Sequence, residues 1–240
     1  MAARLAVAAT GWRAAVVGAV AVAALVAAHP APGQIVSGGA PSQIPPAVPV
    51  NDPRIRLTAR FCEHYRAGSV GTSIRELADM QSMFVAMFGP KDWESSTDDE
   101  KAEVARLYVE AMNYAHERMP GQTPDPVQPG DVAVTESNAA TQPATARVGV
   151  TFRTKGAPVR IVLRLEQQPP QGRAPGDADG FDGWRIVDAY AVGDDSWVTN
   201  MRKPYQALRG TSTPVVFMRQ VHEAVRDAAR AQRASTRPSR

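Results

Sequence analysis

Cysteine and histidine can hold metals or serve as nucleophiles, and they stand close together at one place in this chain, Cys62-Glu63-His64. No second ligand group follows at a recognisable spacing, and structural zinc usually needs four ligands. Cys62 also continues an apolar helical stripe formed by Leu57, Phe61 and Tyr65. We therefore predict a buried structural cysteine and no metal site. Because Cys62 is the only cysteine, the chain cannot form an internal disulfide.

Acid–base catalysis is the second chemistry to consider. Asp188 alternates with Trp184 and Ile186 on the apolar face of a predicted strand, where an unpaired charge is costly and needs a partner. Combined with His64 or His116, Asp188 would supply the acid and base of a hydratase or isomerase. Nothing in the sequence places these side chains together. We predict a protein that is not an enzyme and needs no cofactor, and we keep two alternatives, the hydratase or isomerase and a protein-interaction module with a filled core.

The charge balance argues against nucleic acid as a partner. The chain has 27 Lys and Arg against 24 Asp and Glu, and residues 1–28 contain two arginines and no acid. Without that segment the balance is 25 to 24, which is too even for a nucleic-acid-binding surface. The remaining basic residues gather near the C-terminus, at Arg226, Arg230, Arg233, Arg237 and Arg240. A solvated helix end explains them, and contact with anionic lipid head groups is the alternative.

The first residues predict export from the cytoplasm. Residues 1–28 combine two arginines, an apolar run over 14–28 and small residues at its end, which is the pattern of a secretory signal peptide. The run is shorter than the roughly 20 residues of a spanning helix, although an uncleaved membrane anchor is the alternative. Residues 29–52 are rich in Pro, Gly and Ser and predict a disordered linker. One domain is expected over 53–230, followed by a basic disordered tail at 231–240.

Helices are predicted in the first half of that domain and at its end. The first covers residues 54–67. Ser73-Ile74-Arg75-Glu76 is a capping box that predicts the start of a second helix ending at Gly89-Pro90. Thr97-Asp98-Asp99-Glu100 is a further capping box, before a helix that ends by Pro120. Pro214 suits the first position of a last helix.

Strands are predicted between these helices. Apolar residues alternate over 147–153, 159–166 and 184–192, and residues 131–135 indicate a further short strand. Alternation of this kind is typical of an antiparallel sheet with one covered face. The segment 167–183 between the last two strands is longer than a tight hairpin requires. Helices, then a sheet, then a closing helix predict the α+β class.

Several blocks of the sequence together resemble one family. Phe84–Gly89, Trp93 and Thr97–Glu100 resemble the "LG…W…LTPEQ…F…Y" block of the MlaC or toluene-tolerance family. The likeness continues through Pro158–Arg160 and Gly183–Asp188. It then includes Gly193, Ser196, Asn200 and Arg202, which are similar to the family's "GW+VYDV…EGVS…NYR" block. Each block is short, but they follow one another in the right order and spacing over about residues 54–228.

The resemblance implies a periplasmic phospholipid-binding protein of an ABC-type lipid transport system, which maintains the lipid asymmetry of the outer membrane. Its partners would be phospholipid and the inner- and outer-membrane transport components, and we expect a monomer. The implied fold is a curved antiparallel sheet under N-terminal amphipathic helices, an NTF2-like cradle, with a C-terminal helix. The expected lipid-binding residues are Phe84, Met87, Phe88, Leu107, Tyr108, Met112, Ile161, Leu163, Ile186 and Tyr190. Filling an ordinary core is the alternative role for each of them.

The resemblance also suggests a partner for Asp188. Arg202 lies in the same family-like block, so we predict a structural ion pair between these two residues. The chain departs from the family pattern at Val192, at the inserted Asp194-Asp195 pair and at Met201. These departures concern the partner surface and the ligand more than the fold.

Overall fold

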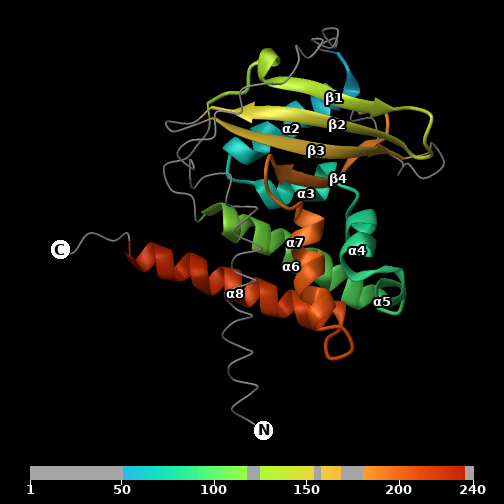
Figure 1. The fold of residues 1–240 in the computed structure, drawn as a ribbon. Coiled ribbons are helices and arrows are strands. Elements are labelled where there is room, and N and C mark those ends of the chain that lie inside the picture. The colour runs from blue at the N-terminus through green and yellow to red at the C-terminus, as the bar shows by residue number, and fades with distance from the viewer. Residues whose placement is uncertain (1–50, 118–124, 154–157, 169–180, 236–240) are drawn as a thin grey trace.

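The computed structural model describes residues 51–117, 125–153, 158–168 and 181–235, which form seven α-helices, one 3-10 helix and four strands (Figure 1). The predicted signal segment and nearly all of the predicted linker lie outside these ranges. The helices are α2 (Pro53–Arg66), α3 (Val70–Leu77), α4 (Met80–Phe88), α5 (Pro90–Glu94), α6 (Asp98–Glu117), η2 (Pro129–Asp131), α7 (Trp197–Ala207) and α8 (Pro214–Ser235). The strands are β1 (Val132–Asn138), β2 (Ala144–Phe152), β3 (Val159–Gln167) and β4 (Trp184–Ala191).

The four strands form one antiparallel sheet in the order β1-β2-β3-β4. Each strand therefore pairs with its neighbour in the sequence, as expected for a meander. Val148 of β2 lies opposite both Val134 of β1 and Leu163 of β3, and all three are buried. This row of apolar residues marks the covered face of the sheet. The sheet and the helices around it confirm the predicted α+β class.

A bulge in β4 changes the predicted pattern of its two faces. Leu163 pairs with Ala189 and Arg164 with Asp188, but the next residue, Leu165, pairs with Ile186. Val187 is therefore an additional residue on β4, a β-bulge. Because of it, the residues before and after Val187 follow opposite orders in pointing to the two faces of the sheet. Ile186 shares the covered face with Ala189 rather than with Asp188. The prediction that Ile186, Asp188 and Tyr190 lie on one face was wrong for this reason.

Helix α2 covers the apolar face of the sheet. Asp52 caps it, since its Oδ1 accepts a hydrogen bond from the backbone N–H of Arg54 at 2.8 Å. The Tyr65 ring lies 5.1 Å from the ring of Phe152 on β2. Cys62 is buried on the same helix, and burial raises the pKa of its thiol to about 12. The apolar stripe and the structural cysteine predicted from the sequence are both confirmed.

The helix start predicted at Ser73 was wrong. Ser73 lies inside α3, where its Oγ donates to the carbonyl oxygen of Val70 at 2.9 Å. The chain leaves the helix at Ala78, and Asp79 caps the next helix by accepting from the backbone N–H of Ser82 at 2.9 Å. A capping box reflects hydrogen bonds among neighbouring residues only. Here α3 packs against α6 and β4, so the helix starts earlier, at Val70, and is interrupted after Leu77.

The junction between α3 and α4 also bonds to the edge strand β4 at one point. The backbone N–H of Asp79 donates to the carbonyl oxygen of Ile186 on β4 at 2.9 Å, and Ala78 forms a parallel bridge with the same residue. An edge strand otherwise leaves its backbone groups unpaired. We name this contact, from Ala78 and Asp79 to Ile186, the β4 seam.

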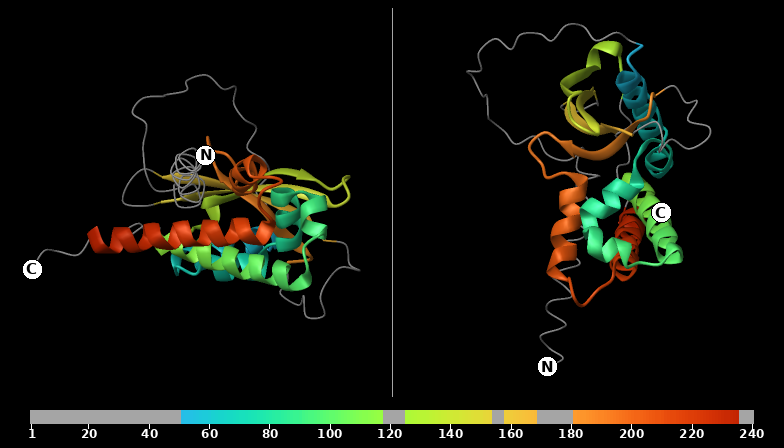
Figure 2. Two further views of the ribbon diagram at one scale, coloured as in Figure 1. Left: turned by 90° about the horizontal axis from the view of Figure 1, so that it is seen from below. Right: turned by 90° about the vertical axis from the view of Figure 1, so that its right-hand side faces the viewer.

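Helices α4 to α8 form a second layer on the far side of the β4 seam (Figures 1 and 2). The capping box that starts α6 is confirmed, because Glu100 Oε2 accepts from the Thr97 N–H at 2.8 Å and Thr97 Oγ1 accepts from the Glu100 N–H at 3.3 Å. Helix α8 begins at Pro214, as predicted, but it continues to Ser235, past the predicted domain end at 230. Helix α7 was not predicted.

The tight packing of α3 on α6 yields a stability prediction at Gly71. Its N–H donates to Asn113 Oδ1 at 2.8 Å, and a Cβ placed on Gly71 would lie 2.8 Å from that same oxygen and closer still to the backbone oxygen of Val109. We expect Gly71→Ala to lower the free energy of unfolding by about 1–3 kcal/mol, because a backbone atom cannot move aside cheaply. Denaturant unfolding measures this.

Gly130→Ala is the matched control. Gly130 is exposed, and a Cβ on it meets no atom within 4 Å, so this substitution should leave the unfolding midpoint nearly unchanged. Equal midpoints for the two variants would contradict the close approach of α3 to α6.

Candidate functional site

The residues predicted to line a lipid site are buried, with the exception of Tyr190. All the others belong to one continuous apolar cluster that extends from the covered face of the sheet into the helical layer. Tyr190 is half-buried and pairs with Val162, on the opposite face of the sheet because of the bulge. The structure thus brings the predicted residues into one interior. It does not test whether a lipid occupies that interior.

Aromatic rings gather in the helical part of this interior. The Phe84 ring on α4 meets the Tyr108 ring on α6 edge-on, with centroids 5.5 Å apart. The Phe88 ring lies 4.9 Å from Tyr205 on α7 and 6.2 Å from Phe217 on α8. Edge-on contacts of this kind add to the stabilisation from burial. Rings therefore join four helices, and two of the rings, those of Tyr205 and Phe217, were not among the predicted lining residues.

Methionines form a second component of the interior. Met83 and Met87 on α4, Met112 on α6, Met201 on α7 and Met218 on α8 are each at most 5% exposed. Methionine side chains are unbranched and polarizable, so they adapt to ligands of different shape. An interior with methionine on four helices can change its internal surface at low cost. Of these five methionines, only Met87 and Met112 were predicted from the sequence to line a lipid site.

The sheet supplies the third component. Ile161 and Leu163 on β3 and Ile186 on β4 are at most 3% exposed and lie on the covered face. Arg160 and Arg164 on β3 point to the other face and are exposed. Arg164 binds Glu166 at 2.9 Å. The structure therefore places these two arginines away from the apolar interior.

Asp188 does not form the predicted ion pair with Arg202. Its Oδ1 accepts hydrogen bonds from the backbone N–H groups of Ala189 at 2.9 Å and Val198 at 3.1 Å. Val198 lies in the first turn of α7, so the positive end of a helix takes the place of a basic side chain. Arg202 is exposed farther along α7, and among the described residues it makes no ion pair with Asp188. The basic residue opposite Asp188 is Arg164 on β3.

Burial sets the protonation behaviour of Asp188. Its removal from water raises the pKa of the carboxyl above the ordinary value, and the hydrogen bonds from Ser196, Val198 and Ala189 oppose this rise without cancelling it. The carboxylate is therefore satisfied by hydrogen bonds but disfavoured as a charge. Of the two histidines considered as acid–base partners, His64 has its ring nitrogens at Ser69 and Glu76, 3.2 Å and 3.1 Å away.

The Tyr108 hydroxyl is a buried polar group without a hydrogen-bond partner among the described residues. Tyr108 is 2% exposed, and burial raises the pKa of its phenol, with a further contribution from the Asp188 carboxylate. An unsatisfied hydroxyl in an apolar interior is uncommon and costly. It is also able to bind a polar group of a ligand.

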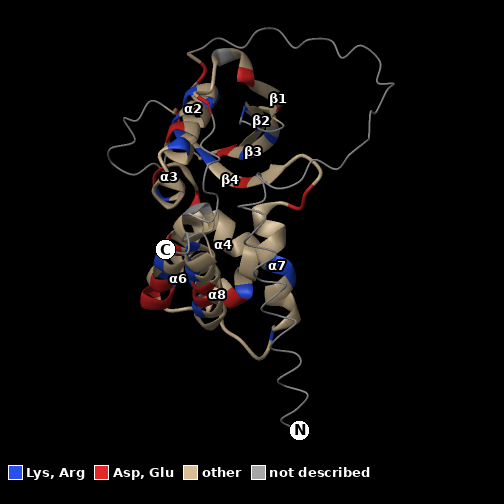
Figure 3. Ribbon diagram, turned by 90° about the vertical axis from the view of Figure 1, so that its left-hand side faces the viewer, with Lys and Arg blue, Asp and Glu red and all other residues tan. Residues whose placement is uncertain are grey.

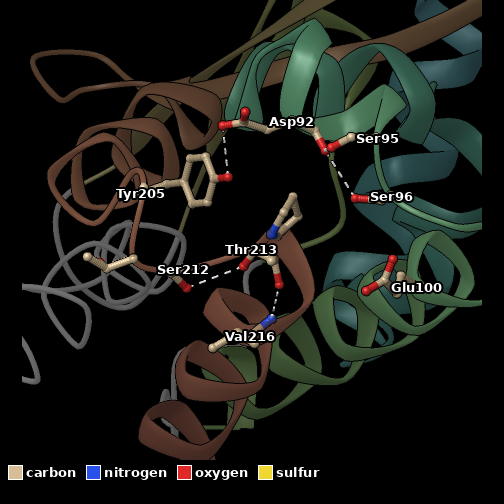
Figure 4. A pocket seen from close by; sticks show the side chains of 11 residues that line it. Asp92, Ser95, Ser96, Glu100, Tyr205, Ser212, Thr213 and Val216 are labelled. Carbon is tan, nitrogen blue, oxygen red and sulfur yellow. Dashed lines mark hydrogen bonds between the residues drawn. The ribbon is translucent and has the colours of Figure 1, made fainter.

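A separate polar pocket lies between α5, the first turn of α6, the end of α7 and the start of α8 (Figure 4). Its volume is about 500 Å³ and its lining includes Asp92, Glu100 and several serine and threonine hydroxyls. Tyr205 donates a hydrogen bond to Asp92 Oδ2 at 3.0 Å, and Arg209 Nε lies 3.2 Å from the same oxygen. The two carboxylates of this pocket, Asp92 and Glu100, thus already accept hydrogen bonds. The polar lining of the pocket does not suit acyl chains.

Within the described part of the chain, no helix is long and apolar enough to cross a bilayer. No group of three or more histidine, cysteine or acidic side chains is arranged to hold a metal ion in the same ranges.

The chain is similar to a solved structure of a bacterial protein, whereas the sequence comparisons found no match. No family model matches the chain, and no curated protein matches it. A phospholipid-binding protein from Ralstonia solanacearum, solved in complex with a phospholipid, aligns with a TM-score of 0.47 and 18% sequence identity. The alignment covers 75% of this chain and 94% of the Ralstonia chain.

The unpartnered hydroxyl leads to a prediction with an unusual sign. Tyr108→Phe removes a buried group that lacks a partner, so it should raise the free energy of unfolding of the ligand-free protein by about 1 kcal/mol. Tyr205→Phe, in the same ring cluster, removes a hydroxyl that donates to Asp92, and it should lower stability by about 1 kcal/mol. Thermal or denaturant unfolding of the two variants checks the contrast. Destabilisation by Tyr108→Phe would show that its hydroxyl has a partner after all.

Asp188 predicts a component of stability that depends on pH. The pKa of Asp188 is raised in the folded protein, so the native state binds the carboxyl proton more tightly than the unfolded chain does. The contribution of Asp188 to the free energy of unfolding is therefore largest at low pH. That contribution is lost as the pH rises from about 4, the ordinary carboxyl value, through the raised pKa. Asp188→Asn keeps an oxygen for both backbone N–H groups but removes the titration. The stability of this variant relative to the native chain should therefore increase with pH over that window, and a difference that stays flat would contradict the raised pKa.

Proposed function

We propose that this protein is a non-catalytic phospholipid carrier that acts outside the cytoplasm and exchanges lipid with the membrane components of an ABC-type transport system. The observation that carries the proposal is the interior shared by sheet and helices. It combines a buried apolar sheet face, methionines on four helices and one unpartnered hydroxyl at Tyr108. Acyl chains need apolar walls of this kind.

The energetics of such a site follow from its composition. Each buried CH₂ of an acyl chain contributes about 0.8 kcal/mol, so even part of one chain can offset the cost of opening the interior. Methionine side chains can move aside and still contact the lipid. The sheet with helices on its apolar face is compatible with an NTF2-like cradle, in which the lipid would enter between the sheet and the helical layer.

The polar end of the lipid would be near Tyr108 and Asp188. The Tyr108 hydroxyl can donate to an ester or phosphate oxygen of the lipid, which would give this hydroxyl the partner that it lacks among the described residues. A protonated Asp188 can donate in the same way, and the raised pKa favours that form more than in an ordinary aspartate. The order of family-like sequence blocks over residues 54–228 and the predicted signal segment agree with this role, in a periplasmic and monomeric protein.

The proposal predicts bound lipid in the purified protein. Native mass spectrometry, with solvent extraction of the same sample, should detect phospholipid in about equimolar amount. A protein that carries no lipid, and that takes none up from vesicles after delipidation, would overturn the carrier function.

A pair of variants separates an interior site from lipid held on the surface. Met112→Phe fills the interior and should reduce the lipid that co-purifies, at a cost of about 1–3 kcal/mol in stability. Val216→Phe adds a ring at an exposed position and should leave the lipid content unchanged. Circular dichroism and thermal unfolding establish that both variants fold. Should Met112→Phe fold and retain full lipid content, the lipid does not occupy this interior.

A further inference from the structure

The C-terminal turns of α8 carry three arginines on one side of the helix. Arg226, Arg230 and Arg233 follow each other at intervals of four and three residues, the spacings that place side chains on the same side. They span about 10 Å along the helix at 1.5 Å per residue. We name these three residues the arginine face. The sequence continues beyond α8 with Arg237 and Arg240.

The fold presents this face at the end of the helical layer. Helix α8 packs beside α6 through its first half, where Arg219 binds Glu103 with two contacts of 2.9 Å and 2.7 Å and His222 lies 2.9 Å from Glu110. In Figures 1 and 2 the last turns of α8 extend past α6 and the other described elements. Arg230 and Arg233 are exposed there.

The local charge is positive although the chain as a whole is nearly balanced. Figure 3 shows residues of both signs on α6 and α8. From Arg226 to the end of α8 the only acid is Asp227, which lies 3.6 Å from Arg226 Nε. Arg226 Nε forms no hydrogen bond within the described part of the chain, and its side chain is one third exposed. From Arg226 to its end, α8 thus carries three arginines and one acid, an excess of positive charge in the sequence of these turns.

The opposite side of the same turns is occupied by small or buried residues. Val225 and Ala229 are buried, and Ala231, Ala234 and Ser235 are small exposed residues of these turns. No large apolar side chain is exposed on these turns. A partner that binds these turns would therefore be held by charge at the helix surface. The helix has no large exposed apolar side chains here with which to insert into an apolar phase.

We propose that the arginine face docks this protein on bilayers that contain anionic phospholipid. A row of cations along one side of a helix is complementary to a plane of phosphates. Arginine also pairs with phosphate through two parallel hydrogen bonds. Docking adds a membrane-facing surface to the proposed carrier, but it does not depend on lipid being held inside the protein.

Co-sedimentation with vesicles tests the proposal. The full chain is mixed with phosphatidylcholine vesicles and with vesicles that contain about 30% phosphatidylglycerol, in low salt and in about 0.5 M salt. The native chain should bind the anionic vesicles much more tightly, and high salt should remove the difference because it screens exposed charges. Each arginine near an anionic surface contributes roughly fivefold in affinity. Arg226→Gln/Arg230→Gln/Arg233→Gln should therefore weaken binding to the anionic vesicles about a hundredfold.

A control variant removes the same total charge from other elements. Arg75→Gln/Lys91→Gln/Arg202→Gln changes exposed residues of α3, α5 and α7 and should keep binding close to that of the native chain. Equal losses in the two triple variants would mean that net charge alone attracts the protein, and absence of any preference for anionic vesicles would also overturn the proposal. Lipid content of each variant is measured separately, so failure of docking and failure of the carrier function remain distinguishable.

Discussion

The architecture depends on the point where the helical layer bonds to the edge strand β4. An edge strand presents a row of backbone groups without strand partners, and at the β4 seam one of them, the carbonyl oxygen of Ile186, accepts a hydrogen bond from the backbone N–H of Asp79. Asp79 also caps α4, so one residue fixes the start of the helical layer relative to the sheet. On the same strand Asp188 accepts the N–H of Val198 and fixes the start of α7. Two aspartates thus orient two helices against β4.

This attachment determines the nature of the interior. Because α4 and α7 start at β4, their apolar sides face α6 and α8 and form one cluster with the covered face of the sheet. The cluster is built from rings, which pack in fixed edge-on geometries, and from methionines, which do not require a single geometry. Such a mixture keeps the fold specific while allowing its internal surface to change. The Tyr108 hydroxyl is a polar group in this apolar interior, and it has no hydrogen-bond partner among the described residues.

Helix α8 connects the interior with the outer surface. Phe217, Val221 and Val225 belong to the core, whereas Arg226, Arg230 and Arg233 follow on another side of the same helix. Its first half is held to α6 by the Arg219–Glu103 pair, and exposed pairs of this kind stabilise a fold only slightly. The anchoring of α8 is therefore mainly apolar. A charged face at its end can contact a membrane without disturbing the contacts that hold the helix in place.

Local signals in the sequence determined much of the secondary structure. Thr97 and Glu100 start α6, Pro214 starts α8, and alternating residues form β2 and β3, because caps and periodicity act over a few neighbouring positions. The apolar identity of most of the predicted lining was also readable, since such side chains are buried in any compact arrangement. Only the tertiary structure decided the Val187 bulge, the break at Asp79 and the partner of Asp188. Each of these depends on a pairing with a distant segment: β3 for the bulge, β4 for the break, and α7 for the carboxylate. A local pattern contains no information on which distant backbone groups will be available to bond.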